Sequence, residues 1–517
     1  MKFETKKREP VLIANRGEIA IRVARTAKML GFPTVAVFSD ADRFSEHVKF
    51  CDHAEFIGES EPKASYLIAD KIIAAAVKHK AKFIHPGYGF LSERPHFVEA
   101  VEKAGLVFVG PSADSMRVMG DKIEARRTVD RLNVPGVPGS PGAVKDAAEA
   151  LEFAKKVKFP VLLKATAGGG GKGMRRVDLE EELVAAFESA SREALSAFGD
   201  GAMYVEKYIL EPHHVEIQVF GDGKGGAIHL GERECSIQRR HQKVWEESPA
   251  PILEVHPATR AKMFDCAVRV AKEIRYAGAG TFEFIVDGAG DFYFLEMNTR
   301  LQVEHPVTEW VTGMDLVAMQ LLLASGELEL PKQESVIRNG ASIEVRVYAE
   351  DPQNFLPAPG KMAKITQPNG PFLRWDSSYE TSGEVSMFYD PMIAKLSVWG
   401  RNRDEAVARM RVALDELSIE APKNSRGQAK GSLKTNVTFL QKLSRCPDVI
   451  KGNTTTDLIP LNPQLTESFT SQDITHEAAI ALALLRLTEG MESSEPIGQS
   501  SERASLWNDR ARVEALR

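Results

Sequence analysis

Cysteine is scarce in this chain: Cys51, Cys235, Cys266 and Cys446 are the four among 517 residues. They are scattered, without the spacing of a metal-ligand cluster or a disulfide framework, which is typical of a protein from a reducing compartment. No apolar run reaches the length of a membrane span, and the charged residues 1–10 are not followed by the apolar segment of a signal peptide. We therefore expect a cytoplasmic protein without a membrane partner.

The chain also lacks a large excess of either charge. Its 66 Lys and Arg against 72 Asp and Glu give a formal net charge of -6, which does not indicate a nucleic-acid partner. One basic stretch, Arg239 to Lys243, fits either a solvated turn or a nucleic-acid patch, but the acidic residues Glu246 and Glu247 that follow argue against the patch. The length is enough for several domains with a large buried core.

The segment EMNTRLQVEHP, residues 296–306, gathers oxygen donors, a fixed cation and a further carboxylate within a few positions. An extended backbone sends alternate side chains to the same face. If this segment is extended, one cavity receives the side chains of Glu296, Asn298, Arg300, Gln302 and Glu304. The pattern therefore predicts one wall of an active site.

A β-hairpin is predicted just before and into this segment. Residues 280–287 have the pattern of a strand, the glycine-containing residues 288–291 form a turn, and residues 292–296 return as the partner strand. Glu283 and Glu296 then meet across the pair. Hard oxygen ligands suit Mg²⁺, which usually bridges nucleotide phosphates, so ATP is the expected ligand. The alternative is that Glu283 and Glu296 are ordinary charged residues on the solvent-exposed face of the hairpin.

A glycine-rich run supplies a candidate phosphate-binding loop. The apolar residues 159–164 predict a strand, and residues 168–174 (GGGGKGM) follow after three small residues. Glycines let backbone N–H groups approach an anion closely, and Lys164 and Lys172 add positive charge. The spacing is not that of a Walker A motif. A flexible linker is the alternative, but the position between a strand and a helix expected to start near Asp178 favours a phosphate-covering loop.

Several ordered motifs make the chain resemble the ATP-grasp superfamily and, within it, the biotin carboxylase component of biotin-dependent carboxylases. The motifs are residues 13–20 (IANRGEIA), 85–93 (HPGYGFLSE), 119–122 (MGDK), the glycine run, 206–209 (EKYI), 232–243 (ERECSIQRRHQK) and 296–306. The resemblance covers most of the chain. It implies an α/β and α+β multidomain protein: an ATP-grasp fold with an N-terminal Rossmann-like layer domain and a β-rich C-terminal domain.

The resemblance also implies a role for individual residues at the nucleotide site. Phosphates are bound by Lys122 and Lys164 and covered by the backbone of Gly170 and Gly171. The adenine meets the stretch Glu206, Lys207, Tyr208 and Ile209, and the nucleotide is also contacted by His214 and His241. The divalent metal ions, Mg²⁺ or Mn²⁺, are held by Glu283, Glu296 and Asn298.

For the second substrate, the resemblance implies a bicarbonate site made of Lys243, Arg300, Gln302 and the amide of Val303. Glu304 is then the base that activates bicarbonate, and Arg346 faces the ureido oxygen of biotin. The implied reaction is ATP-dependent carboxylation of biotin through carboxyphosphate, the first half-reaction of an acyl-CoA carboxylase in fatty acid metabolism. Another ATP-grasp ligase, or a non-catalytic scaffold with this fold, remains an alternative, and the sequence does not identify the final carboxyl acceptor.

Three assignments have a simpler structural interpretation. His214 is also compatible with an ordinary strand histidine, and Arg346 with a strand arginine paired to a neighbouring glutamate. Glu304 is compatible with a residue that only holds Arg300, since a carboxylate beside an arginine normally has a lowered pKa and is a weak base.

The N-terminal region shows a strand–helix–strand pattern, with strands expected at 11–14 and 34–38 and a helix at 18–30. The expected domains are 1–121 (N-terminal, Rossmann-like), 122–325 (ATP-grasp, with a mobile lid at about 136–207), 326–468 (C-terminal, β-rich from about Phe355) and a tail, 469–517. Residues 421–431 look like an exposed insertion of unassigned function.

The tail is a candidate segment for docking a partner protein, with capping of the C-terminal domain as the alternative. No biotin-acceptor motif of the Ala-Met-Lys-Met type occurs in the sequence. Biotin is therefore expected on a carrier protein or domain, with a carboxyltransferase subunit as a further partner. The resemblance also implies a homodimer or a larger hetero-oligomer.

Overall fold

The computed structural model describes residues 8–165, 174–198, 201–240, 242–425 and 429–467. The chain divides into two compact units, Met1–Thr466 and Glu467–Arg517, and the description below concerns the first. The predicted roles of Gly170, Gly171, His241 and the tail 469–517 lie outside the described residues, as does the side chain of Lys122.

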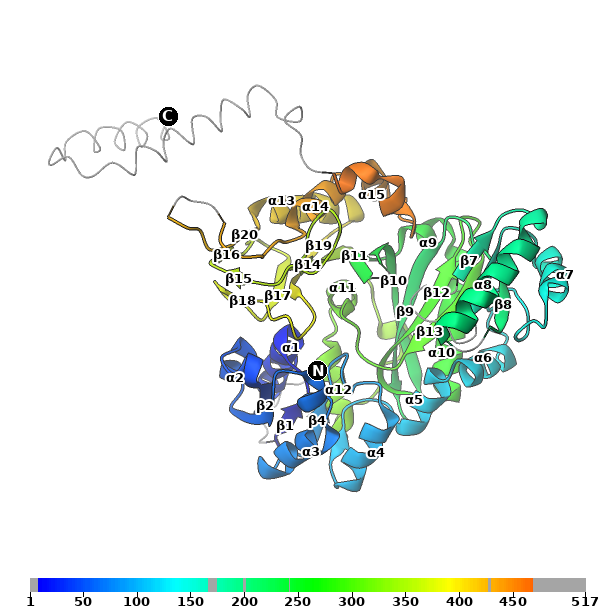
Figure 1. Cartoon of the computed structure of the whole chain (residues 1–517). Helices are drawn as coiled ribbons and strands as arrows, with labels where there is room; N and C mark the ends of the chain where they lie inside the picture. Colours follow the sequence, from blue (N-terminus) through cyan, green and yellow to red (C-terminus); the bar gives the residue numbers. More distant parts are fainter. Residues whose placement is uncertain (1–7, 166–173, 199–200, 241, 426–428, 468–517) are drawn as a thin grey trace, which may run out of the picture. The chain divides into compact units, whose positions relative to one another are not determined.

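The N-terminal region, in the blue part of Figure 1, contains a parallel sheet. The sheet has five strands in the order β3-β2-β1-β4-β5. Strand β1, Val11–Ile13, is completely buried, as expected for an apolar strand of a parallel sheet covered on both faces. The predicted strand–helix–strand unit is confirmed as β1, α1 (Gly17–Met29) and β2 (Thr34–Ser39). The other elements are β3 His53–Gly58, β4 Phe83–His85, β5 Val107–Phe108, α2 Glu46–Phe50, α3 Ala69–Lys78, α4 Pro95–Lys103 and α5 Ala113–Gly120.

A three-stranded antiparallel sheet, β7-β6-β8, follows at the right of Figure 1. Its elements are α6 Lys122–Arg131, α7 Ala147–Val157, β6 Val161–Ala165, β7 Met174–Val177, α8 Leu183–Phe198 and β8 Met203–Lys207. The helix expected to start near Asp178 is confirmed to within a few residues: a 3-10 turn, Glu180–Glu182, leads directly into α8 at Leu183. The sequence did not predict the preceding strand, residues 174–177, which pairs with β6 and satisfies the backbone groups along one edge of it.

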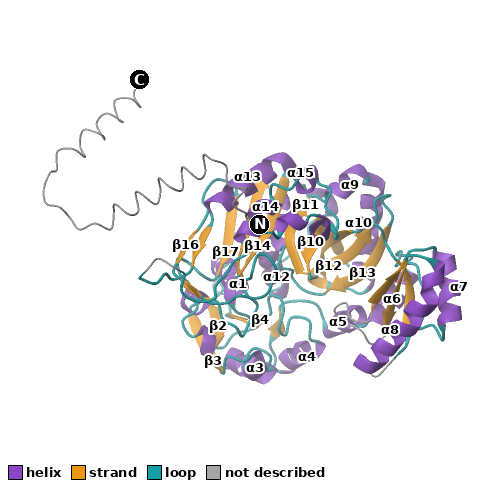
Figure 2. Cartoon of the chain, turned by 45° about the horizontal axis from the view of Figure 1, so that its top comes forward, coloured by secondary structure: helices purple, strands orange, loops and turns teal. Residues whose placement is uncertain are grey.

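An eight-stranded sheet in the order β13-β12-β9-β10-β11-β14-β19-β17 forms the centre of the fold (Figure 2). All of its neighbouring strands are antiparallel. The predicted hairpin is confirmed as β12, Ala277–Val286, and β13, Phe292–Asn298. The remaining elements of this part are β9 His213–Asp222, β10 Ala227–Arg239, β11 Gln242–Ser248, α9 Pro251–Val255, α10 Pro257–Glu273, α11 His305–Thr312 and α12 Leu316–Ala324.

Three C-terminal strands, β14, β19 and β17, extend this central sheet, and the short strands form two separate pairs, β15-β18 and β16-β20. The predicted β-rich region therefore starts before Phe355, at β14, Ala341–Tyr348, which pairs with β11. The other elements are β15 Lys361–Met362, β16 Lys364–Thr366, β17 Leu373–Ser377, β18 Gly383–Glu384, β19 Met392–Gly400, α13 Arg403–Glu416, β20 Ser418–Glu420, α14 Val437–Leu443, α15 Pro447–Lys451 and α16 Leu458–Leu461. The domain limits themselves stay predictions.

The two faces of the C-terminal half-sheet differ in chemistry because side chains alternate along each strand. Ile343, Val345 and Leu396 belong to an apolar core that also includes residues of α13. The opposite face carries buried polar residues, among them Glu344 and Lys395. Helix α11 contacts both β14 and β19. A buried, charged surface therefore lies next to the segment that leads into α11.

Within the described residues, no single helix combines the length and apolar composition needed to cross a membrane. The pair α11 and α12 passes that test only when joined, across a bend of 94°. Every residue from Leu316 to Leu322 of α12 is buried in the protein. An all-round apolar helix is typical of a protein core as well as of a membrane span.

Candidate active site

The site is built on the β12–β13 hairpin. Glu283 lies directly opposite Glu296, which confirms the predicted meeting of these residues across the strand pair. The Glu283 Oε1 atom accepts hydrogen bonds from Asn298 Nδ2 at 2.7 Å and from Gln302 Nε2 at 2.8 Å. The antiparallel pairing thus brings one carboxylate into contact with two side-chain amides of the next segment.

The segment 296–306 is not extended throughout, contrary to the simplest form of the prediction. Strand β13 ends at Asn298, and Glu304 is the N-cap of α11. Pro306 in the first turn suits a helix start, because the N–H group that proline lacks would have no partner within the helix. Gln302 and Glu304 nevertheless reach the same cluster, as their contacts with Glu283 and Lys243 show.

Lys243 of β11 is the central cation of the site. Its Nζ lies 3.1 Å from Glu283 Oε1 and 2.8 Å from Glu304 Oε1, and it also contacts Glu216. Burial alone would lower the pKa of this ammonium group, but the three carboxylates outweigh burial and raise it well above its usual value. Lys243 is therefore a permanent cation held between carboxylates from two strands, β9 and β12, and from the N-cap of α11.

Glu216 of β9 belongs to the site and was missed by the sequence analysis. It is fully buried and pairs with Arg233 at 3.0 Å, with Lys243 and with His214. Burial opposes its ionisation, yet Lys243 and Arg233 lower its pKa to about 2. A charged residue in a strand that is otherwise buried was the available signal, because such residues are almost always paired.

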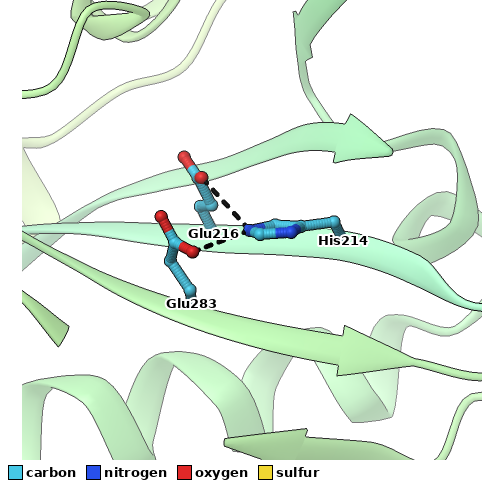
Figure 3. Close-up of side chains that lie close together, drawn as sticks. All are labelled: His214, Glu216 and Glu283. Atoms are coloured by element: carbon cyan, nitrogen blue, oxygen red, sulfur yellow. Dashed lines mark ion pairs between the residues drawn. The ribbon is translucent and has the colours of Figure 1, made fainter. Parts of the chain in front are cut away.

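His214 lies against two carboxylates, so it is not an isolated strand histidine (Figure 3). Its Nε2 is 3.0 Å from Glu283 and 3.4 Å from Glu216. Although burial lowers the pKa of the imidazole, Glu283 and Glu216 raise it to about 9. These three residues have ligand atoms within 4.8 Å of one another. A protonated imidazole offers no lone pair, however, so in this form the group is a neutralised ion cluster.

Arg346 of β14 closes the cluster on the far side. Its Nη2 lies 3.0 Å from Glu304 Oε2, and its Nε donates to Glu246 Oε1 at 2.6 Å. The structural alternative for Arg346 therefore holds in part, since a neighbouring glutamate does bind it. Burial opposes ionisation of Glu304, but Lys243 and Arg346 lower its pKa below the usual value. Glu304 is thus an ionised group held between two cations.

Arg300 is held by a residue of the N-terminal region. Its Nε donates to Glu93 Oε2 at 2.9 Å, and its Nη2 donates to Asn298 Oδ1 at 2.8 Å. The alternative in which Glu304 holds Arg300 is wrong, because Glu304 binds Lys243 and Arg346. Glu93 also accepts from the Thr299 amide at 2.9 Å, which ties this loop to the N-terminal region.

The other predicted nucleotide residues lie on the three-stranded sheet and its exit. Lys164 of β6 and Glu206 of β8 form an ion pair with each other, and both side chains are about one-third exposed. The Lys207 Nζ donates to the Val157 carbonyl at 3.4 Å, Arg176 stacks over the Tyr208 ring at 4.4 Å, and Ile209 is buried. Among the described residues, none of these side chains forms a hydrogen bond or ion pair with Glu283, Lys243 or Glu304.

The donor set around Glu283 and Glu296 fits a divalent cation. Burial raises the pKa of Glu296, and the negative charges of Glu283 and Glu93 raise it further. A divalent cation bound between these carboxylates would offset their mutual repulsion and favour the ionised form of Glu296. Carboxylate and carboxamide oxygens are the ligands that Mg²⁺ prefers. The residues present therefore fit a magnesium ion.

The pH dependence of stability should report on Glu246. Burial raises its pKa to about 7, although Arg346 opposes the shift, and its ordinary value is 4.5. The folded state therefore keeps this proton where the unfolded state has lost it. The stabilising contribution is complete below pH 4.5 and disappears as the pH rises through about 7, by roughly 3 kcal/mol in all. Denaturant unfolding at pH 5 and pH 8 should show a smaller difference for Glu246→Gln than for the unsubstituted protein.

The exposed residue Glu188 provides the control for this measurement, since Glu188→Gln should leave the difference between the two pH values unchanged. A Glu246→Gln variant with the full original difference would show that another group is responsible.

Comparisons with known proteins agree with this geometry. Residues 7–116 match the family model "Biotin carboxylase, N-terminal domain", and residues 344–460 match "Biotin carboxylase C-terminal domain". Residues 121–332 match "Carbamoyl-phosphate synthase L chain, ATP binding domain". The chain belongs to the biotin carboxylase family. Its fold is the ATP-grasp fold of that family, with the N-terminal and C-terminal regions expected from the sequence.

Individual members of the biotin carboxylase family match over most of the chain. A biotin carboxylase from Nostoc sp. is 46% identical over 89% of this chain and 99% of its own length. The mitochondrial methylcrotonoyl-CoA carboxylase subunit alpha of Dictyostelium discoideum is 45% identical over 94% of this chain and 68% of its own length.

A solved structure also matches closely. It is the biotin carboxylase domain dimer of the Hydrogenobacter thermophilus 2-oxoglutarate carboxylase, in complex with MgADP, ADP and bicarbonate. The TM-score is 0.79 at 43% identity, covering 90% of this chain and 100% of that one. These matches distinguish the chain from the ligases of other ATP-grasp families.

Proposed function

We propose that this protein is an enzyme that uses ATP and bicarbonate to carboxylate biotin. One observation carries the proposal: a continuous chain of contacts, from Glu283 through Lys243 and Glu304 to Arg346. In this chain of contacts, Glu283 is suited to bind magnesium and Lys243 to bind the bicarbonate anion. Glu304 is an ionised base, and Arg346 is suited to stabilise an oxyanion. A ligase that joins an acyl phosphate to an amine needs the magnesium-binding carboxylate, but it does not need the base and the arginine together.

The nucleotide is assigned to the three-stranded sheet and the residues next to it. Lys164 is placed to bind phosphate once it leaves its ion pair with Glu206, and we assign the adenine to Glu206 to Ile209, at the end of β8 and just beyond it. We assign phosphate contacts to Lys122 and to the backbone of Gly170 and Gly171, and a nucleotide contact to His241. His214 is proposed as a further nucleotide contact, at the Glu283 end of the site.

Bicarbonate is assigned to the space bounded by Lys243, Arg300, Gln302 and the Val303 amide. Cations on two sides lower the energy of the bound anion, and Glu304, ionised by its own neighbours, accepts its proton. The deprotonated oxygen then attacks the γ-phosphorus of ATP, the bond from this phosphorus to the β–γ bridging oxygen breaks, and ADP leaves. A magnesium ion held by Glu283, Glu296 and Asn298 would neutralise charge on the phosphate oxygens during this transfer.

The product of this transfer is carboxyphosphate, which breaks down to carbon dioxide and phosphate. The phosphate is a suitable base for the N1′ proton of biotin, and the resulting nitrogen attacks carbon dioxide. Arg346 then stabilises negative charge on the ureido oxygen, because a guanidinium remains charged and presents its N–H groups in a fixed plane. Exclusion of water from the site protects an intermediate that hydrolyses readily.

We assign biotin to a carrier protein or domain and transfer of the carboxyl group to a carboxyltransferase partner. The methylcrotonoyl-CoA carboxylase relative supports an acyl-CoA as the final acceptor and a role in acyl-CoA or fatty acid metabolism. The 2-oxoglutarate carboxylase relative shows that the family also works with other acceptors. The dimer named for that structure supports a homodimer. A cytoplasmic location is consistent with four buried, unpaired cysteines.

The assay that tests this function measures ADP release by the purified protein with Mg²⁺, ATP and free biotin, with and without bicarbonate. We expect ADP release to require bicarbonate and to increase when biotin is added. ATP cleavage that is independent of bicarbonate would indicate a different ATP-grasp reaction. A complete lack of turnover would favour the scaffold.

A further inference from the structure

Lys395 of β19 is a buried cation that the proposed mechanism does not use. Its side chain is 1% exposed, and its Nζ donates a hydrogen bond to the Val303 carbonyl at 2.8 Å. The only ion pair recorded for it among the described residues is with Glu18 Oε1, at 3.3 Å. Its neighbours on adjacent strands are Arg346 and Asp376. Lys395 thus connects the charged face of the central sheet to the loop before α11.

This position is costly for a lysine. Lysines are almost never fully buried unless they are paired, and Lys395 also lies near the N-terminus of α11, where the helix dipole disfavours a cation. Glu18 offsets part of this cost when ionised, and so does Asp376 on the adjacent strand. Burial opposes the ionisation of Asp376, but Arg374 and Lys395 lower its pKa to about 2. Glu18 is itself tied to the N-terminal region, because its Oε1 accepts a hydrogen bond from the Tyr88 hydroxyl. A charge held in such a place needs a specific contact to explain it.

The Val303 carbonyl provides that contact. Val303 lies between Gln302 and Glu304, whose side chains contact Glu283 and Lys243. A hydrogen bond to its carbonyl fixes the plane of the peptide that joins Val303 to Glu304. Because successive peptide planes share a Cα atom, this also restricts the direction of the Val303 N–H group and the start of the Glu304 side chain.

We propose that Lys395 is a positioning residue for bicarbonate: it holds the Val303 peptide so that the Val303 amide and the Glu304 carboxylate face the anion together. The proposal rests on the proposed function, since it deepens the description of the same site. Lys395 itself does not touch the substrate. Glu18 and Asp376 balance its charge, and the Tyr88 hydroxyl holds Glu18 in place.

The test is Lys395→Met, which keeps an unbranched side chain of similar length and removes the donor. The KM for bicarbonate in ATP cleavage should rise about ten- to a hundred-fold, the factor that corresponds to loss of a hydrogen bond from a charged donor. The KM for ATP should change by less than about two-fold, because Lys395 does not contact the residues assigned to the nucleotide. If Lys395 had only a structural role, the substitution would lower the amount of folded protein but would not raise the KM for bicarbonate more than the KM for ATP.

The double variant Lys395→Met/Glu18→Gln separates positioning from charge balance. It removes both members of the pair, so folding should recover even if Lys395→Met alone folds poorly. The KM for bicarbonate should stay high in the double variant. Recovery of the original KM would overturn the proposal and assign Lys395 to charge balance.

Arg403→Met is the matched control. Arg403 pairs with buried Glu247 of β11 in the same sheet, at 2.6 Å, without contacting Val303. This variant should keep the bicarbonate KM of the unsubstituted protein. An equal rise for Arg403→Met, or no rise for Lys395→Met in an active protein, would overturn the positioning role. Failure of the unsubstituted protein to cleave ATP with bicarbonate would instead overturn the proposed function.

Discussion

Replacing Arg346 with methionine should lower the rate of biotin carboxylation by about a hundred- to a thousand-fold, the usual cost of removing one donor to an oxyanion. Bicarbonate-dependent ATP cleavage without biotin should fall by much less, because the Lys243 contacts to Glu283 and Glu304 remain. The physical reason is that charge develops on the ureido oxygen only in the second step. Radiolabelled bicarbonate incorporated into biotin, measured beside ADP release, separates the two steps.

The control for this prediction is Arg260→Met. Arg260 also pairs with a fully buried carboxylate, Glu232, at 3.0 Å, so the variant reproduces the loss of a buried ion pair away from the proposed biotin contact. Its ratio of biotin carboxylation to ATP cleavage should match that of the unsubstituted protein. Equal losses of both reactions in Arg346→Met would contradict the assigned role and place Arg346 in the bicarbonate step.

Glu216→Gln should have the second large effect, on stability and activity together. The substitution leaves Arg233, which is fully buried, and Lys243 without their shared carboxylate. Breaking a buried pair by removing one partner typically costs about 3–5 kcal/mol, because an uncompensated buried charge remains. Lys243 would also lose the contact that directs it, so ATP cleavage should fall about a hundred-fold or more, by the same reasoning as for a displaced charge stabiliser. Denaturant unfolding and ADP release measure the two effects.

Glu232→Gln is the matched variant for this experiment. Glu232 is equally buried and is paired with Arg260 and Arg338. We expect a similar loss of stability with ATP cleavage retained in the folded fraction. If Glu216→Gln kept full turnover per folded molecule, Glu216 would be a structural residue only.

Local patterns predicted the elements that are continuous in sequence. The first strand–helix–strand unit and the β12–β13 hairpin were confirmed because hydrophobic periodicity and a glycine turn act over a few residues. Strand β7, Met174–Val177, was missed because it is short and contains two arginines, which weakens the apolar alternation. Its formation depends on pairing with β6, and no local signal reports that pairing.

The candidate site was predicted only in part, for the same physical reason. Glu283, Glu296 and Asn298 share one hairpin, so alternation placed them together. Glu216 and Glu18 come from a different strand and a different helix, and their partners are fixed by the order of strands in the sheet. Glu246 was read from sequence only as an acidic residue that opposes nucleic-acid binding, whereas it is buried against Arg346. Roles at the nucleotide remain predictions, because a pattern shows residue types and not the ligand.

The central sheet runs without interruption from β13 to β17, so the ATP-grasp strands and the C-terminal strands share one ladder of backbone hydrogen bonds. Splitting the gene between β11 and β14 would expose the unpaired edges of both strands. Such edges are templates for intermolecular pairing. The two fragments should therefore be recovered mainly as insoluble material when expressed separately, and co-expression should be needed to restore a soluble product.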